Sequence, residues 1–169
     1  MANEHCLILI KPDGLVKSLT GNIITALSET KLKIIGAKVV KVSKELAEKH
    51  YHELKTKKPQ VFENTIQYIM GKFHTDRVLA LVYAGEEATK KIREIVGPTN
   101  PEEASPISIR GKYGRINSKT GVLENCIHAS DSIENAEKEI KLWFSPDEIV
   151  IDLFKTKTQK KEVEVKTWA

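Results

Sequence analysis

The strongest constraint on the fold is the apolar run Arg77–Ala84, which reads Arg-Val-Leu-Ala-Leu-Val-Tyr-Ala. An apolar run of this kind, ended by Gly85-Glu86-Glu87, predicts a buried strand. A second run, Leu7–Ile10, stops at Lys11-Pro12-Asp13-Gly14, whose residue types favour a turn. The stretch Leu32–Val42 is rich in Ile and Val and predicts a third strand. These segments are expected to form a sheet.

Helical patterns lie between and after the predicted strands. Apolar residues recur at steps of three and four after Thr20, and Ser43 is expected to cap a second helix through Leu54. Further helices are predicted from Pro59 to Met70 and after Gly85. No internal repeat or linker interrupts this series, so a single domain is expected.

Three stretches have no clear helix or strand pattern. From Gly97 to Gly114 the chain reads as a loop with three prolines, and long loops inside compact domains are usually functional or mobile. Tyr113–Leu123 is rich in Gly, Asn, Ser and Lys and is expected to be a protruding hairpin or a flexible excursion. After a helix that ends near Phe144, the segment Ile149–Phe154 is apolar again.

Composition sets the class of protein. A chain of 169 residues with 40% hydrophobic and 30% charged residues is expected to fold around a real core. The net charge of +4 suits a phosphate-bearing ligand but does not require nucleic acid. Cys6 and Cys126 both lie in apolar runs, where cysteine acts as a small hydrophobe. Since we find no secretory leader and no apolar run near 18 residues, we expect a cytoplasmic protein without a membrane span.

The segment Asn125–Ser132 places one histidine before a predicted helix. Asp131 is followed three residues later by Glu134, which approximates a capping box, and the helix behind it has one apolar face, formed by Ile133, Ala136, Ile140 and Trp143. His128 is therefore expected in the turn before this helix, near the positive end of its dipole, where phosphate binds readily. Glu139, in the second turn, is placed to orient the imidazole. A histidine at such a position more often caps or packs than reacts.

Several chemistries are excluded. The glycine-rich phosphate-binding motifs and Cys-x-x-Cys are absent from the sequence. His50 and His52 are two residues apart, which puts them on different faces of a helix and argues against a shared metal. Ser130, His128 and Asp131 are nearly adjacent and have no nucleophile elbow, so a hydrolase triad is not favoured.

A series of motifs instead points to one family. They occur in the order Lys11-Pro12-Asp13-Gly14, His50-Tyr51, Arg93, Gly97-x-Thr99-Asn100-Pro101, Ile109-Arg110-Gly111, Asn125-Cys126-Ile127-His128-Ala129-Ser130-Asp131-Ser132, Glu137-Lys138-Glu139-Ile140 and Leu142-Trp143-Phe144. In this combination the chain resembles nucleoside diphosphate kinase across residues 5–150. The resemblance implies an α/β (α+β sandwich) fold of the ferredoxin-like kind, in which helices cover a four-stranded antiparallel sheet. It also implies a homo-oligomer, with a hexamer favoured over a tetramer.

The resemblance further implies a reaction. The γ-phosphate of ATP or another nucleoside triphosphate would pass to a nucleoside diphosphate in a ping-pong mechanism through a phosphohistidine at His128. The residue chemistry agrees, because neutral imidazole is a competent nucleophile near neutral pH and covalent capture splits the transfer into two steps. Mg²⁺ is expected to arrive with the nucleotide, held by phosphates and water, and no side chain is expected to ligate a metal.

The family's functional positions carry over to this sequence one by one. Beside His128, the catalytic set comprises Lys11, Tyr51, Ser130 and Glu139, with Glu139 orienting the imidazole and Ser130 bonded to that glutamate. The positions expected to contact phosphate or sugar are Lys11, Arg93, Thr99, Arg110 and Asn125. Three of these residues are cations, as phosphoryl transfer needs positioned positive charge.

The chain departs from the family where an aromatic ring should stack on the base. Counting back from Tyr68, Val61 occupies that position and Phe62 lies one residue beyond. Either Val61 is the platform, or two extra residues around Lys57 and Lys58 rotate the helix so that Phe62 takes over the stacking. The register from Tyr68 favours Val61.

Two further departures are smaller. Ala129 replaces the glycine that usually follows the histidine, and the segment between Gly111 and Asn125 is longer than usual. We expect a catalytic domain at residues 1–154 and a C-terminal tail at 155–169.

Two other classes of function fit the sequence less well. One is a catalytically silent nucleotide-binding or scaffold protein on the same fold, which would not need the whole set of site residues. The other is a nucleic-acid-binding module that uses the sheet and the basic tail, and it is the less favoured of the two, so nucleic acid is not an expected partner.

Overall fold

The computed structural model describes residues 4–160, 163–165 and 167–168. Its helices and strands follow one another as β1 (Glu4–Ile10), α1 (Pro12–Val16), α2 (Thr20–Ser28), β2 (Lys33–Lys41), α3 (Lys44–His50), α4 (His52–Lys57), α5 (Pro59–Ile69), β3 (Arg77–Gly85), α6 (Ala88–Val96), α7 (Ile109–Tyr113), β4 (Arg115–Ile116), β5 (Leu123–Glu124), β6 (Ile127–Ala129) and α8 (Ile133–Trp143). Two short 3-10 helices lie at Pro101–Glu103 and Pro146–Glu148.

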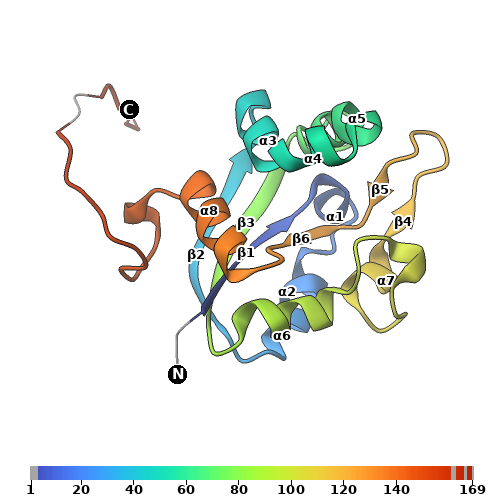
Figure 1. Cartoon of the computed structure of the whole chain (residues 1–169), viewed down its shortest axis with the longest axis horizontal. Helices are drawn as coiled ribbons and strands as arrows, with labels where there is room; N and C mark the ends of the chain where they lie inside the picture. Colours follow the sequence, from blue (N-terminus) through green and yellow to red (C-terminus); the bar gives the residue numbers. More distant parts are fainter. Residues whose placement is uncertain (1–3, 161–162, 166, 169) are drawn as a thin grey trace.

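The main sheet has four strands in the order β2-β3-β1-β6, and every neighbouring pair is antiparallel. The helices lie on both sides of this sheet, with α3, α5 and α8 on one side and α2 and α6 on the other (Figure 1). This arrangement confirms the predicted α/β fold, and the strand order is that of the ferredoxin-like plan.

Alternation along β1 explains why the sheet needs both helical layers. Leu7 and Leu9 pack into the core on the α3, α5 and α8 side, whereas Cys6, Ile8 and Ile10 pack into the core on the α2 and α6 side. All five side chains are fully buried. Burying a large aliphatic side chain contributes about 1.5–3 kcal/mol relative to exposing it, so β1 anchors both halves of the core.

The region after Ser43 differs from the expected single helix. The Ser43 side chain accepts a hydrogen bond from Leu46 N at 3.1 Å, which confirms the predicted cap. The helix ends at His50, however, and α4 starts at His52, because Tyr51 leaves the helical conformation with φ −99° and ψ 21°. The break turns Tyr51 toward the cavity described below.

The start of α8 also corrects two expectations. Ser132, not Asp131, caps the helix by accepting from Asn135 N at 3.1 Å, and Asp131 instead accepts from the Asn135 side chain at 2.7 Å. His128 lies in strand β6, opposite Leu9 of β1, and not in the turn before the helix. Pairing with β1 extends the backbone at His128, and three residues are too few to give a strand pattern in the sequence.

The predicted loop and excursion both contain regular structure. Ser108 accepts from Gly111 N at 3.2 Å and caps the short helix α7 inside the segment expected to be a loop. The excursion forms the β4–β5 hairpin. Glu124, which is 1% exposed, accepts hydrogen bonds from Arg115 Nε at 2.7 Å and Asn117 Nδ2 at 2.6 Å. These bonds join the β5 side of the hairpin to its β4 side.

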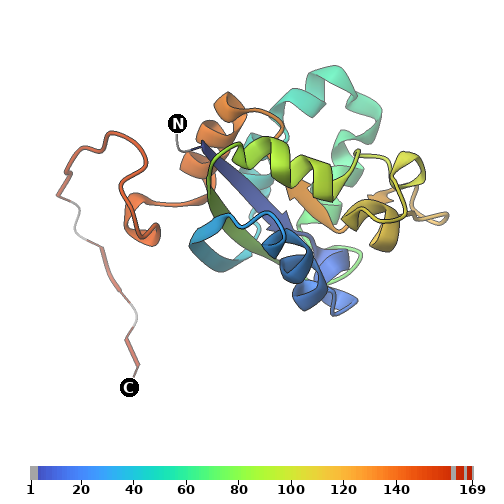
Figure 2. The same ribbon diagram turned by 90° about the horizontal axis from the view of Figure 1, so that it is seen from below.

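After α8 the chain lies against the edge strand β2 before leaving the domain. Val150 N donates to Ile35 O at 2.9 Å, and Leu153 and Phe154 pack against the core. The described residues beyond Phe154 are exposed and run away from the domain (Figures 1 and 2). Among the described residues, no helix has both the length and the apolar character needed to span a membrane.

Candidate active site

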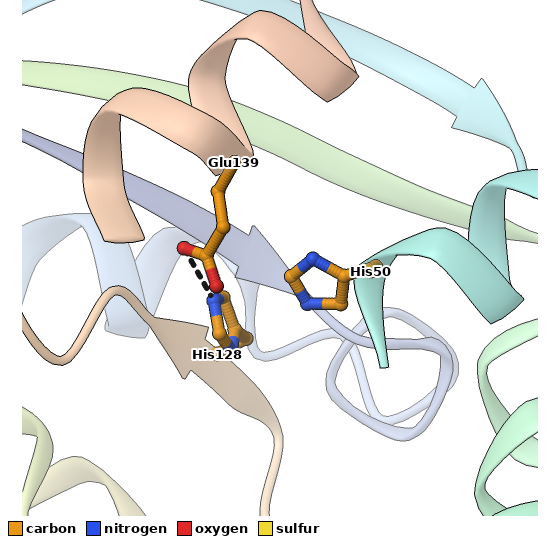
Figure 3. A group of neighbouring side chains, drawn as sticks. All are labelled: His50, His128 and Glu139. Atoms are coloured by element: carbon orange, nitrogen blue, oxygen red, sulfur yellow. Dashed lines mark hydrogen bonds and ion pairs between the residues drawn. The ribbon is translucent and has the colours of Figure 1, made fainter. Parts of the chain in front are cut away.

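Strand β6 and helix α8 bring a histidine and a carboxylate together. His128 Nε2 lies 3.0 Å from Glu139 Oε2 (Figure 3). Ser130 Oγ donates to the same carboxylate oxygen at 2.5 Å. Ser130 is fully buried and its Oγ accepts from Leu7 N at 3.1 Å, which fixes the hydroxyl. Since a carboxylate at Nε2 favours the tautomer with its proton there, Nδ1 of His128 carries a free lone pair.

A second imidazole lies against the first. The ring centroids of His50 and His128 are 4.5 Å apart with their planes at 79°, and His50 reaches this position from the end of α3 (Figure 3). Trp143 Nε1 donates to His50 Nδ1 at 3.1 Å. Burial, together with the neighbouring His128 and Lys11, holds the pKa of His50 well below its ordinary value.

His50, His128 and Glu139 present ligand atoms within 4.8 Å of one another, which raises the question of a metal. Two imidazoles and a carboxylate are a known ligand set for Zn²⁺. The donor chemistry fits poorly, however, because the Trp143 N–H occupies the lone pair on His50 Nδ1. The proton of neutral His50 then sits on Nε2, and neither nitrogen offers a free lone pair to a cation.

Lys11 is a buried cation at the end of β1. It is 7% exposed, and its Nζ donates to Asn125 Oδ1 at 2.8 Å. Burial, and then the charge of Arg110, lowers the pKa of Lys11 to about 8. A buried ammonium with one neutral partner gains from an anion beside it, so Lys11 is suited to a phosphate ligand.

Arg110, in α7, is held by backbone carbonyls. Its Nη1 donates to Gly97 O at 2.8 Å and its Nη2 to Ile127 O at 3.0 Å, whereas Nε is buried without a partner in the described part of the chain. Burial and the charge of Arg93 on α6 lower the pKa of Arg110 to about 10. The guanidinium groups of Arg93 and Arg110 are therefore near each other. Among the described residues, neither of them forms an ion pair with a carboxylate.

A cavity of about 280 Å³ opens beside Lys11. Five of the sequence-predicted site residues line it, namely Lys11, Tyr51, Val61, Thr99 and Asn125. Asn125 Nδ2 donates to Thr99 O at 2.8 Å, which joins two sides of the wall. His128, Ser130, Glu139, Arg93 and Arg110 are not part of this lining.

The two candidates for the base platform separate clearly. Val61 lines the cavity and is 39% exposed, whereas Phe62 is 9% exposed and belongs to the core on the α3, α5 and α8 side. The rotation of α5 that would bring Phe62 to the base is therefore absent. Phe62, Ile66 and Ile69 recur at helical spacing and form the face of α5 that packs into this core.

Some cavity residues were not among the sequence-predicted site residues. Gly121, Val122 and Leu123 from the β4–β5 hairpin and Leu54 from α4 also line the cavity, together with Lys58, Asn64, Thr65 and Tyr68. The hairpin segment was recognised as unusually long, but nothing in the local sequence indicated that it reaches the cavity. His50 and Trp143 belonged to the family motifs without an assigned role.

A histidine with an oriented lone pair, two buried cations and a cavity that Lys11 helps to line define a site for phosphoryl transfer. Comparison with known proteins agrees. The sequence profile of the nucleoside diphosphate kinase family matches residues 4–149. The nucleoside diphosphate kinase of Pyrococcus furiosus is 43% identical over 146 residues, which cover 86% of each chain.

Solved structures resemble the protein to a similar extent. The nucleoside-diphosphate kinase of Borrelia burgdorferi, in a transition-state mimic with bound vanadate and ADP, superposes with a TM-score of 0.79 at 29% identity, covering 92% of this chain and 93% of that one. The enzyme of Halobacterium salinarum in complex with CDP gives a TM-score of 0.77 at 33% identity, covering 91% and 95%. The chain belongs to the nucleoside diphosphate kinase family. Its activity is that of a nucleotide phosphotransferase.

Proposed function

We propose that this protein passes the γ-phosphate of a nucleoside triphosphate to a nucleoside diphosphate through a phosphohistidine at His128. The carrying observation is the bond between His128 Nε2 and Glu139, which leaves Nδ1 as the nucleophile. In the first step the Nδ1–phosphorus bond forms while the bond from phosphorus to the β,γ-bridging oxygen breaks, and the nucleoside diphosphate leaves with that electron pair. The second step reverses this exchange with another nucleoside diphosphate.

The charge that builds on the phosphoryl oxygens is met by cations and one hydroxyl. Lys11, Arg93 and Arg110 supply positive charge, and the unpartnered Nε of Arg110 supplies a further donor. The Tyr51 hydroxyl is also buried without a partner among the described residues, and burial raises its pKa, so it stays protonated and can donate. Ser130 acts through Glu139.

The nucleotide occupies the cavity, with Thr99 and Asn125 as phosphate or sugar contacts and Val61 as the base surface. An aliphatic surface tolerates any base because it makes no directional contacts. The different bases of ADP and CDP in the two similar structures support a site of low base selectivity.

Mg²⁺ accompanies the nucleotide and supplies further positive charge to its phosphates. The cavity lining contains no carboxylate, and the acidic groups nearby are engaged. Asp13 accepts from Tyr68 and Cys126, and Glu124 accepts from Arg115 and Asn117. The ion would therefore be held by phosphates and water, the coordination that Mg²⁺ commonly keeps.

The catalytic domain spans residues 1–154, the tail 155–169, and the protein acts as a cytoplasmic homo-oligomer, with a hexamer favoured over a tetramer. Exposed apolar side chains on the edge strand β2, Ile34 and Val39, support association. Cys6 and Cys126 are unpaired and buried, which suits a reducing compartment.

A coupled assay between ATP and a second nucleoside diphosphate tests the proposal against the silent-scaffold alternative. The expected result is formation of the second triphosphate with parallel-line, ping-pong kinetics. A protein that binds nucleotide but forms no second triphosphate would be the silent scaffold. Lines that intersect would contradict the covalent intermediate.

A further inference from the structure

The proposed mechanism leaves one half-buried imidazole without a task. His50 ends α3 and lies edge to face against His128, beside the His128–Glu139 pair (Figure 3). It also contacts the rings of Tyr51 and Trp143, at centroid distances of 4.6 Å and 5.5 Å. A titratable ring packed against the proposed nucleophile requires a physical account.

Trp143 fixes the tautomer of His50. The indole N–H can only donate, so the nitrogen that it contacts, His50 Nδ1, must accept. The neutral ring therefore has its proton on Nε2. Forming the imidazolium would place a second N–H against that of Trp143, and burial already disfavours the charged form.

The proton on Nε2 has no acceptor. The His50 Nε2 atom is buried and has no hydrogen-bond partner in the described part of the chain. Leaving a buried donor unpaired costs free energy, which is unusual unless the acceptor arrives with a ligand. His128 is the adjacent group that gains hydrogen-bond acceptors during the reaction. In the phosphohistidine, the phosphoryl group bonded to its Nδ1 carries three oxygens.

One helix arranges both imidazoles. Glu139 and Trp143 are four residues apart on α8 and so lie on the same face. Glu139 orients His128, and Trp143 orients His50. The two rings are therefore set relative to each other by a rigid element, as required for a donor that must meet a group attached to its neighbour.

We propose that His50 is a further catalytic residue, whose Nε2–H donates a hydrogen bond to an oxygen of the phosphoryl group as it passes to and from Nδ1 of His128. The inference rests on the phosphohistidine mechanism proposed above. His50 loses and gains no proton in the step, since only the Nδ1–phosphorus and phosphorus–oxygen bonds change. It adds a neutral donor to the cations Lys11 and Arg110.

Two substitutions at His50 separate donation from packing. His50→Phe keeps a ring but removes the donor, and His50→Gln keeps an amide N–H near the place of Nε2. We expect His50→Phe to slow phosphorylation of His128 by ATP and Mg²⁺ in a single turnover by roughly a hundred- to a thousandfold, as for the loss of one transition-state donor. His50→Gln should recover part of that rate, and the KM for the nucleoside diphosphate should stay within about twofold because the contact belongs to the transition state.

Phosphorylation of His128 in the wild-type protein separates a failure of this inference from a failure of the proposed function. If wild-type His128 takes no phosphate, the phosphohistidine mechanism itself fails. If wild-type His128 is phosphorylated and folded His50→Phe reacts at the same rate, the role of His50 is refuted. Equal losses in His50→Phe and His50→Gln would also refute donation and leave only packing.

If thermal unfolding shows that His50→Phe does not fold, the inference can be tested by ¹⁵N NMR spectra of the wild-type protein. The inference requires the proton of His50 on Nε2 in the free protein and a changed Nε2 shift in the phosphorylated protein. A proton on Nδ1, or an Nε2 shift unaffected by phosphorylation, would overturn it.

Discussion

At the scale of single residues, the cations of the site are held by neutral partners. Lys11 is bonded to the Asn125 amide, and Arg110 to the carbonyls of Gly97 and Ile127. An ion pair with a carboxylate would neutralise these groups before the nucleotide arrives. Neutral partners fix their positions and leave their charge available to phosphate.

Replacing Lys11 with alanine should therefore depress turnover strongly without unfolding the protein. Removing one positioned donor to a developing anion costs roughly 2.7–4 kcal/mol, about a hundred- to a thousandfold in kcat. Steady-state kinetics with ATP and a second nucleoside diphosphate provide the measurement. Lys90→Ala, which removes an exposed lysine of α6, is the matched control and should retain wild-type kcat. A loss of less than a few-fold in Lys11→Ala would show that Lys11 does not contact the phosphate.

The lowered pKa of Lys11 predicts an alkaline limit to the reaction of the free enzyme. The ammonium loses its proton as pH rises through about 8, so kcat/KM should fall above that pH. Bound phosphate restores the proton, because a neighbouring anion favours the charged form. The plot of kcat against pH should hence stay flat to a higher pH than that of kcat/KM. If kcat and kcat/KM fell at the same alkaline pH, the result would contradict this account.

At the scale of elements, one helix and one hairpin complete the site. Helix α8 supplies Glu139 and Trp143, and the β4–β5 hairpin supplies part of the cavity wall. The hairpin is short, and two paired residues on each strand would not hold it alone. Glu124 compensates by joining it to Lys17 at 3.4 Å and to His74 at 3.0 Å.

Loss of the Glu124 charge should destabilise the fold in a pH-dependent way. Burial would raise the pKa of Glu124, but bonds from Arg115 and Asn117 and the charges of His74 and Lys17 outweigh it and lower that pKa to about 2. A depressed carboxyl pKa adds stability above the unfolded value near 4.5, and this stability is lost as pH falls toward 2.

Glu124→Gln should accordingly lower the free energy of unfolding by about 1–3 kcal/mol at pH 7, because the linkage of 1.36 kcal/mol per pKa unit is reduced by solvent around the exposed partner Arg115. Urea unfolding of both proteins measures the difference, which should narrow as pH is lowered from 4.5 to 2. Glu48→Gln, at an exposed ion pair with Lys44, is the control and should change stability by less than about 1 kcal/mol. A Glu124→Gln difference that is the same at pH 3 and pH 7 would show that the charge is not responsible.

The placement of α5 gives opposite predictions for two adjacent residues. Val61→Ala should weaken nucleoside diphosphate binding with little change in melting temperature, because Val61 faces the cavity. Phe62→Ala should instead lower the free energy of unfolding by about 3–5 kcal/mol, because it empties part of the core. Calorimetric titration and thermal unfolding separate the two effects. Weakened binding in a Phe62→Ala protein of unchanged stability would reverse the assignment.

At the scale of the whole molecule, the sequence predicts best what local pattern determines. The strands at Leu7–Ile10 and Arg77–Ala84 are continuous apolar runs, and both lie in the centre of the sheet. Strand β6 was missed because three residues carry no periodicity, and its conformation comes from pairing with β1. The β4–β5 hairpin reaches the cavity through contacts distant in sequence, which no local signal records.

The candidate site shows the same division. Family motifs named Lys11, Asn125, His128, Ser130 and Glu139, and the structure brings these residues into direct hydrogen-bonded groups. The motifs did not show which nitrogen of His128 faces Glu139 or that Trp143 holds His50. Those contacts depend on strand register and helix rotation, which emerge only when α8 packs on the sheet.

The central claim is that His128 carries the phosphoryl group, and intact mass measures it directly. After incubation with ATP and Mg²⁺, the wild-type protein should gain the mass of one phosphate that is lost in acid, as expected for a phosphohistidine. His128→Ala should gain none, whereas His74→Ala, which removes a histidine bonded to Glu124, should be labelled like the wild type. Full, acid-labile labelling of His128→Ala would contradict the account.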